Sequence, residues 1–194
     1  VYYRKGSAAS RLSPEDLKPS YITGAKILHI SGITPALSKS CCEATWKALE
    51  IAKKNGVKVS FDSNIRRKLW SLEEAENTLA PMLSYVDYLF TDPSDAKVLL
   101  NEEEPKRICE KALSKGPSLV IVKMPDARYV AMTRDEYIEK AGFQAPIVDI
   151  VGAGDAFASG VLASLLKGLP LEKAIAVGNA ASALVVTVRG DFEA

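Results

Sequence analysis

The sequence has 194 residues, enough for one domain with a sizeable core and marginal for two. Apolar residues make up 47% and charged residues 25%, the range of ordinary soluble globular proteins. The formal net charge is +1, and Lys and Arg are interspersed with Asp and Glu. This balance excludes a strongly basic protein, and we expect no nucleic-acid partner.

Cysteine use and hydropathy indicate a cytoplasmic protein. The three cysteines are too few, and odd in number, for a disulfide framework, and the single histidine, His29, offers no zinc pattern. We therefore expect reduced thiols. No run of eighteen apolar residues is present, so we expect no membrane span. The abrupt first and last residues lead us to expect a piece of a longer protein.

Helix-like and strand-like patterns alternate along the chain. Apolar, β-branched runs predict strands at residues 26–31, 57–61, 85–90 and 118–122, with a hairpin at 128–132 and 136–140. Helices are predicted to begin after Ser38, after Ser71 with Glu74 in a capping box, and at Pro93. Further helices are predicted at residues 104–115, 153–167 and 171–186.

This alternation predicts an α/β fold with a mostly parallel sheet covered by helices on both faces. Ligands of such sheets bind outside the carboxyl ends of the strands. Candidate functional residues should therefore lie at 31–32, 62–66, 91–95 and 123–128, and in the turn before residue 153.

The strongest local motif is Gly152-Ala153-Gly154-Asp155, at the point where a strand-like segment becomes a helix. Small residues let backbone N–H groups converge on an anion, and the helix N-terminus favours negative charge. The carboxylate of Asp155 could accept the proton of an attacking hydroxyl, as phosphoryl transfer requires. A glycine-rich turn followed by a capping Asp is the alternative. The motif lacks the Gly-Lys-Ser/Thr ending of a Walker A loop.

With upstream Asp149 and the Ala-rich segment at 178–184, this motif resembles the signature of ribokinase-type (PfkB) carbohydrate kinases. The segments that most resemble the family's 2-keto-3-deoxygluconate kinases are 2–10, 12–16, 31–34, 61–66 with 69–70, and 189–191. The resemblance implies a three-layer ribokinase-like sandwich. It also implies that residues 1–194 are the larger, C-terminal part of one kinase domain, without its N-terminal segment and lid.

The resemblance implies roles for particular residues. Asp155 would be the general base, and Gly152, Ala153 and Gly154 would form an anion hole. Substrate would be bound by Tyr2, Arg4, Arg66 and Asp191. A guanidinium such as that of Arg4 suits a carboxylate because it can donate two hydrogen bonds. Read without the resemblance, these residues fit a solvated edge strand and surface loops.

Nucleotide contacts are implied for Asn64, Asp92 and Lys123. Asp92-Pro93-Ser94-Asp95 occupies the place of the family's Asn-x-x-Glu motif, so the resemblance implies that Asp95 acts indirectly on Mg²⁺. An Asp that caps its own helix is the alternative. After Lys123 the family has a Gly-x-x-Gly turn, whereas this chain has Pro125 and Arg128 at the glycine positions.

The expected function is ATP-dependent phosphorylation of a sugar acid, at C6 of 2-keto-3-deoxygluconate, with Mg²⁺ accompanying the nucleotide. The alternatives are another sugar or nucleoside kinase of the same fold and a non-catalytic, sugar-binding relative. Tyr2, Arg4 and Arg66 favour an acid substrate over a neutral sugar. The resemblance also implies that the full-length protein is a homo-oligomer.

Overall fold

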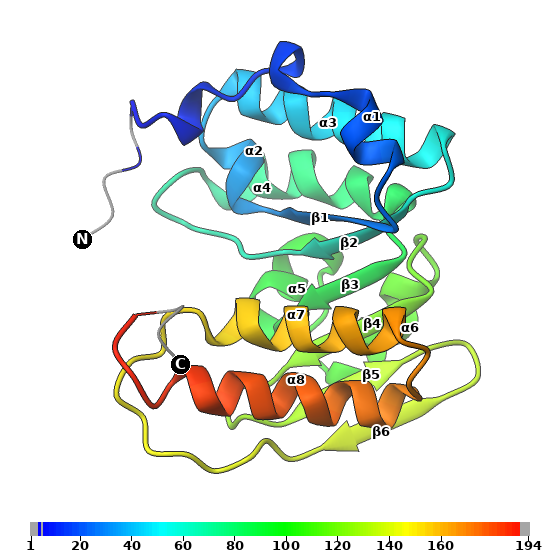
Figure 1. Cartoon of the computed structure of the whole chain (residues 1–194), viewed down its shortest axis with the longest axis vertical. Coiled ribbons are helices and arrows are strands. Elements are labelled where there is room, and N and C mark those ends of the chain that lie inside the picture. The colour runs from blue at the N-terminus through cyan, green and yellow to red at the C-terminus, as the bar shows by residue number, and fades with distance from the viewer. Residues whose placement is uncertain (1–3, 5, 191–194) are drawn as a thin grey trace. The chain divides into compact units, whose positions relative to one another are not determined.

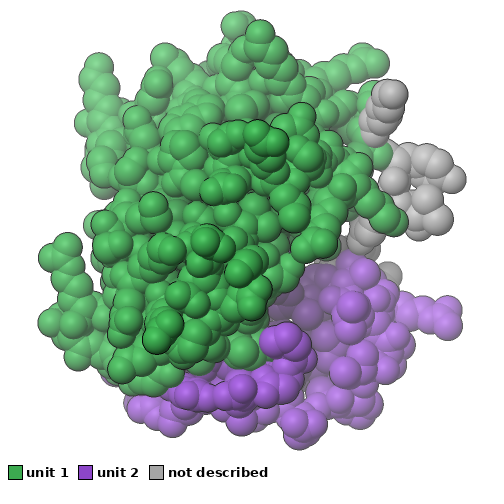
Figure 2. Space-filling view, turned by 180° about the vertical axis from the view of Figure 1, so that it is seen from behind, with its two compact units in different colours: residues 1–124, 130–137 green, residues 125–129, 138–194 purple. Residues whose placement is uncertain are grey.

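The computed structural model describes residue 4 and residues 6–190, and Figure 1 traces their helices and strands. The chain forms two compact units, which Figure 2 colours separately. Unit 1 comprises residues 1–124 and 130–137, and unit 2 comprises residues 125–129 and 138–194. Among the residues described, no helix has the length and apolar character needed to cross a membrane.

The strands of the described residues form one six-stranded sheet in their order along the chain. They are β1 (Ile27–Ser31), β2 (Lys58–Asp62), β3 (Tyr88–Thr91), β4 (Leu119–Lys123), β5 (Tyr129–Met132) and β6 (Tyr137–Lys140). Strands β1 to β4 pair in parallel, with Ser31 opposite Asp62 and Thr91 opposite Val122. Their carboxyl ends therefore meet at one edge of the sheet, as the sequence predicted.

Unit 1 also holds helices before and between these parallel strands. Before β1 lie the 3₁₀ turns η1 (Ala9–Arg11) and η2 (Pro14–Asp16) and the helix α1 (Pro19–Thr23). Between the strands lie α2 (Ile33–Ala36), α3 (Lys39–Lys54), α4 (Leu72–Leu79), the 3₁₀ turn η3 (Ala80–Tyr85), α5 (Pro93–Leu100) and α6 (Pro105–Leu113). Parallel crossovers are right-handed, and each new strand joins the same side of the sheet. The connecting helices α3 to α6 thus lie on one face.

Local capping signals place the helix starts where the sequence predicted them. Ser38 Oγ accepts a hydrogen bond from the N–H of Cys41, 3.1 Å away. Ser71 and Glu74 form the predicted reciprocal capping box. Strand β3 starts at Tyr88, three residues after the predicted start at residue 85, because Ala80–Tyr85 forms a 3₁₀ turn that the apolar pattern did not reveal.

The core of unit 1 lies between the sheet and these helices. Its fully buried members include Leu49, Phe61, Leu83, Leu89 and Ile108. Ile65 and Trp70, which follow β2, are partly buried and pack against the same core. The chain that leaves the carboxyl end of β2 is thereby anchored by apolar contacts at two points.

Unit 2 is built on two long helices, α7 (Ala153–Leu166) and α8 (Leu171–Val185). Glycines let them approach closely: a Cβ at Gly178 would lie 2.8 Å from Phe157 O and 2.7 Å from Val161 Cγ2. A Cβ at Gly160 would lie 2.9 Å from the Gly178 Cα. The close contact fixes α7, and with it the turn that precedes α7, against α8.

Candidate active site

The carboxyl edge of unit 1 contains a partly buried ion pair. Lys123, at the end of β4, donates to both carboxylate oxygens of Asp62, at the end of β2, over 3.0 and 3.1 Å. The Asp62 side chain is 6% exposed and that of Lys123 24% exposed. Lys123 was predicted to bind nucleotide; its ammonium lies at the predicted edge, with its charge balanced by Asp62.

The segment after β2, residues 63–66, is held by the strand ends on both sides of it. Ser63 N–H donates to Phe90 O over 3.0 Å, and Asn64 Nδ2 donates to Ser31 Oγ over 3.1 Å. Asn64 adopts a left-handed conformation, with φ of 36°. The backbone at Gly32 lies so close that a Cβ there would be 1.9 Å from Ser63 O. We call residues 63–66 the β2 loop; it ends on the exposed Arg66.

Asp92 and Asp95 lie at the N-terminus of α5. Asp92 caps the helix, since its Oδ1 accepts the Asp95 N–H over 2.9 Å. Asp95 is buried, 7% exposed, and its Oδ2 accepts hydrogen bonds from Ser63 Oγ (2.6 Å) and Ile65 N–H (3.0 Å). The capping alternative for Asp92 is thus observed, and Asp95 contacts the β2 loop.

Burial raises the pKa of the Asp95 carboxyl to about 6. The negative charges of Asp92 and Asp62 also raise this pKa, whereas the hydrogen bonds from Ser63 and Ile65 lower it. The carboxylate is therefore held in an environment that opposes its charge, and the two hydrogen bonds offset part of that cost.

The fit of these residues to Mg²⁺ can be tested from the donor set. Within the described part of the chain, no group of three or more His, Cys, Asp or Glu side chains could hold a metal ion. Mg²⁺ in phosphate-transfer sites is commonly bound by one or two carboxylates together with phosphates and water. The half-buried Asp92 suits that arrangement. Asp95 suits it poorly because one of its oxygens is committed to the β2 loop.

In unit 2, the Gly152-Ala153-Gly154 motif forms the turn that begins α7. Gly152 is the N-cap residue and has φ of 81°, a conformation that favours glycine. Asp149 Oδ1 accepts the Val151 N–H over 3.1 Å and steadies the turn. The Ala153 N–H donates to Ile150 O over 3.4 Å. The next N–H groups of the helix, those of Gly154 and Asp155, have no partner within the helix and can face an anion.

Asp155 is exposed in the first turn of α7 and lines a hollow of about 510 Å³. The remaining lining residues come from the start of α7, with its N-cap residue, and from the last turns of α8: Gly152, Ala156, Ser159, Ala181, Leu184 and Val185. The hollow combines a carboxylate, a helix N-terminus and mostly small or apolar side chains. Such a lining suits a charged group attached to a flat or apolar body.

The turn that follows Lys123 differs from a glycine-rich turn in its charge. Arg128 Nε donates to Asp126 Oδ2 over 2.6 Å, and its Nη1 donates to Glu139 Oε1. Ala127 adopts a left-handed conformation with φ of 61° despite its Cβ. Ala127, next to the glycine position that Arg128 occupies, thus supplies the positive φ that a glycine there would favour. Arg128 itself is held by the carboxylates of Asp126 and Glu139.

Only some of the predicted substrate-binding residues lie within the described part of the chain. Tyr2 and Asp191 lie outside the described residues. Arg4 is half-buried, and its carbonyl accepts the Ser7 N–H over 3.2 Å. Arg66 is exposed at the end of the β2 loop. The structure therefore brings together Asn64, Asp92, Asp95 and Lys123 at one edge of the sheet in unit 1. Arg66 follows Asn64 at the end of the β2 loop.

Sequence reasoning missed several residues of these two sites. Ser63 and Thr91 are buried, and their hydroxyl oxygens lie 3.0 Å apart beside Asp95. Their position directly after β2 and at the end of β3 was the available signal. The part played by Ala181, Leu184 and Val185 in the hollow had no comparable signal, since their spacing reads simply as one face of a helix.

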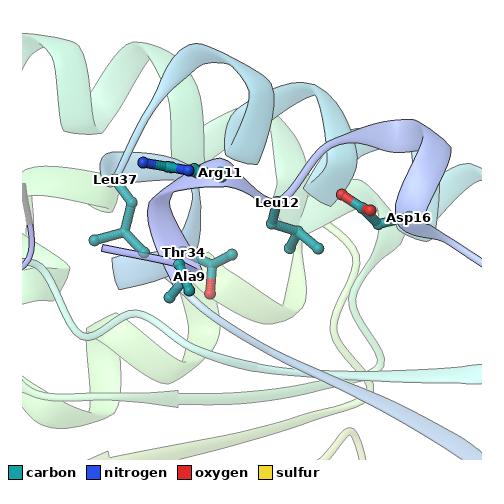
Figure 3. A pocket seen from close by; sticks show the side chains of 7 residues that line it. Ala9, Arg11, Leu12, Asp16, Thr34 and Leu37 are labelled. Carbon is teal, nitrogen blue, oxygen red and sulfur yellow. The ribbon is translucent and has the colours of Figure 1, made fainter. Parts of the chain in front are cut away.

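A second hollow, of about 480 Å³, lies in unit 1 (Figure 3). Its lining includes the apolar Ala9, Leu12 and Leu37 and the charged Arg11 and Asp16. The Asp16 carboxylate accepts hydrogen bonds from the N–H and Oγ of Ser13. None of the predicted site residues lines this hollow.

Comparison with known proteins gives consistent matches. A model of the pfkB family carbohydrate kinases matches residues 1–193. A 2-dehydro-3-deoxygluconokinase of Thermoproteus tenax is 40% identical over 197 residues, which cover 100% of this chain. The match covers 59% of that relative, so the chain spans less than two thirds of its length.

Solved structures agree. The 2-dehydro-3-deoxygluconokinase of Thermotoga maritima has a TM-score of 0.90 and 32% identity, covering 99% of this chain and 64% of that one. A ribokinase-like protein from E. coli, in complex with ATP and Mg²⁺, has a TM-score of 0.92 and 28% identity, covering 100% and 62%. These likenesses confirm the ribokinase-like α/β fold that the sequence predicted.

Proposed function

The chain belongs to the PfkB family of carbohydrate kinases, and from this premise we propose that the full gene product phosphorylates a sugar acid with ATP. The proposed acceptor is the C6 hydroxyl of 2-keto-3-deoxygluconate, also called 2-dehydro-3-deoxygluconate. Relatives with that name, 40% and 34% identical over the whole chain, support the choice. The observation that carries the proposal is the carboxylate of Asp155 beside the left-handed turn at Gly152.

In the proposed reaction, the C6 oxygen forms a bond to the γ-phosphorus while the bond from that phosphorus to the β–γ bridging oxygen breaks. ADP leaves, and Asp155 takes the proton of the hydroxyl. The N–H groups of Gly154 and Asp155 and the dipole of α7 stabilise the negative charge on the moving phosphoryl group. Exposure of Asp155 in a hollow supports this role, because the base must reach the substrate.

The sugar acid would be recognised by Arg66 and Arg4, with Tyr2 and Asp191 on its hydroxyls. The exposed guanidinium of Arg66, at the carboxyl edge of the sheet, supports the assignment, since a guanidinium can donate two hydrogen bonds to one carboxylate. Neutral sugars offer no group that would require such a partner.

The nucleotide phosphates would contact Asn64 and Lys123, whose side chains reach the same sheet edge. When bound, Mg²⁺ would neutralise part of the phosphate charge, with Asp92 as the residue best suited to hold it. Arg128, held by Asp126 and Glu139, presents a guanidinium where the family turn has glycine. Because this chain lacks the glycines of that family turn, a non-catalytic, sugar-binding relative is the second candidate.

Release of ADP by the purified full gene product, measured in a coupled assay, tests the proposal. The acceptors are 2-keto-3-deoxygluconate, its galactonate epimer, their neutral alcohol analogues, a neutral sugar and a nucleoside. The proposal expects turnover with one or both acids and little with the others. Preference for a neutral sugar or nucleoside would contradict it. Binding of the acid without ADP release would establish the non-catalytic candidate.

A further inference from the structure

We propose that Asp95 is a positioning residue that sets the β2 loop, and through it Arg66, for recognition of the substrate carboxylate. This assignment departs from the indirect role toward Mg²⁺ that the sequence motif suggested for Asp95. It rests on the proposed role of Arg66 in reading the acid.

The first observation is the use that Asp95 makes of its carboxylate. One oxygen, Oδ2, accepts both the Ser63 hydroxyl, at 2.6 Å, and the Ile65 backbone N–H, at 3.0 Å. These donors are the first and third residues of a four-residue loop, 32 and 30 residues away in sequence. A single buried oxygen therefore holds the side chain of Ser63 and the backbone of Ile65, the residue directly before Arg66.

The second observation is that Asp95 itself is held in place. Its N–H donates to Asp92 Oδ1, its side chain is 7% exposed, and it lies in the first turn of α5. An acceptor fixed on a helix has little freedom to follow a moving loop, so the loop takes its position from the helix.

The third observation is that the other side of the β2 loop is equally confined. Asn64 donates to Ser31 Oγ, and Gly32 leaves no space for a Cβ against Ser63 O. Ile65 packs on the core of unit 1. Because the loop is clamped between the ends of β1 and β3, loss of the Asp95 contact frees only its α5 side. Arg66, which is exposed and has no ion pair among the described residues, is then the side chain whose position changes most.

The test compares Asp95→Ala with Asp95→Asn in the full gene product. The readout is the ratio of KM for the acid sugar to KM for its neutral alcohol analogue. We expect Asp95→Ala to raise this ratio about tenfold, the scale of one lost charge-assisted hydrogen bond. Asparagine keeps an acceptor oxygen and should restore most of the preference, with an unchanged Mg²⁺ requirement. A role toward the metal requires the negative charge, so equal damage in both variants with a raised Mg²⁺ requirement overturns the assignment.

Asp87→Ala is the matched control. Asp87 also accepts a backbone N–H, that of Val59, and pairs with Lys58, but it lies before β3, at the opposite edge of the sheet. This variant should lose stability without changing the KM ratio. Ser63→Ala, which removes only one of the two donors, serves if Asp95→Ala does not fold, and should raise the ratio by a smaller factor.

A double variant separates this inference from the proposed function. If Asp95 acts through Arg66, Asp95→Ala should change the ratio less than about twofold once Arg66→Ala is present. An effect of Arg66→Ala alone, with none of Asp95→Ala, overturns the positioning role and leaves the proposed function intact. If Arg66→Ala leaves the KM ratio unchanged, Arg66 does not recognise the substrate carboxylate, and that part of the proposed function is overturned. Amide exchange at Ile65, which needs no activity, should become faster in Asp95→Ala and remain unchanged in Asp87→Ala.

Discussion

Burial of Asp95 has a measurable consequence for stability as a function of pH. Its pKa is raised from 3.8 to about 6 in the folded protein. A raised folded pKa means that the native state holds the proton more tightly than the unfolded chain. The associated stability is therefore fully present below about pH 4 and is lost as the pH rises through 6. A shift of roughly two units corresponds to about 3 kcal/mol of unfolding free energy.

The substitution Asp95→Asn tests this contribution to the unfolding free energy. It removes the titrating carboxyl and keeps an acceptor oxygen for Ser63 and Ile65. Urea unfolding of both proteins at pH 4 and pH 7.5 gives two differences in unfolding free energy. We expect the difference to move in favour of the variant by about 3 kcal/mol between these pH values. A difference that stays constant would mean that the carboxyl is hydrated in the native state, and the buried geometry of Asp95 would be refuted.

Three further substitutions test the packing of α7 on α8, the β2 loop and the role of Arg66. Gly178→Ala should cost about 1–3 kcal/mol in thermal unfolding, because its Cβ would meet Phe157 O at 2.8 Å, whereas Val177→Ala on the exposed side should cost little. Gly32→Ala, whose Cβ would lie 1.9 Å from Ser63 O, should lower stability by a similar amount in urea unfolding and loosen the β2 loop. Arg66→Ala should raise KM for an acid sugar by at least about tenfold more than for its alcohol analogue; equal effects would show that Arg66 does not read the acid.

The fold was largely predictable because its signals are local. Ser38, the pair Ser71 and Glu74, and Pro93 mark helix starts through contacts within one turn, and each helix begins where predicted. The start of β3 was placed wrongly because Tyr85 and Val86 are apolar whether they lie in a strand or in a 3₁₀ turn. At these two positions apolar character indicates burial, but it does not distinguish a strand from a 3₁₀ turn.

The candidate sites were predictable only in part. The turn at Gly152 is a contiguous motif, and it begins α7 with Asp155 in the first turn, where the sequence placed them. The roles of these residues stay predictions. The partners of Asp95 and Lys123 were not predictable, since Ser63 lies 32 residues from the first and Asp62 lies 61 residues from the second. Such contacts depend on which strands are neighbours and in which register, and no local pattern records that.

Asp155, as the base that accepts the proton of the sugar hydroxyl, is the central residue of the proposed reaction. Asp155→Asn in the full gene product keeps the size of the side chain and removes its basicity. Turnover of ATP with the acid sugar, together with sugar binding by calorimetry, measures the consequence. We expect turnover to fall about a hundred- to ten-thousandfold, while the dissociation constant of the sugar changes little. A variant that keeps more than about a tenth of wild-type turnover would place the base elsewhere in the protein.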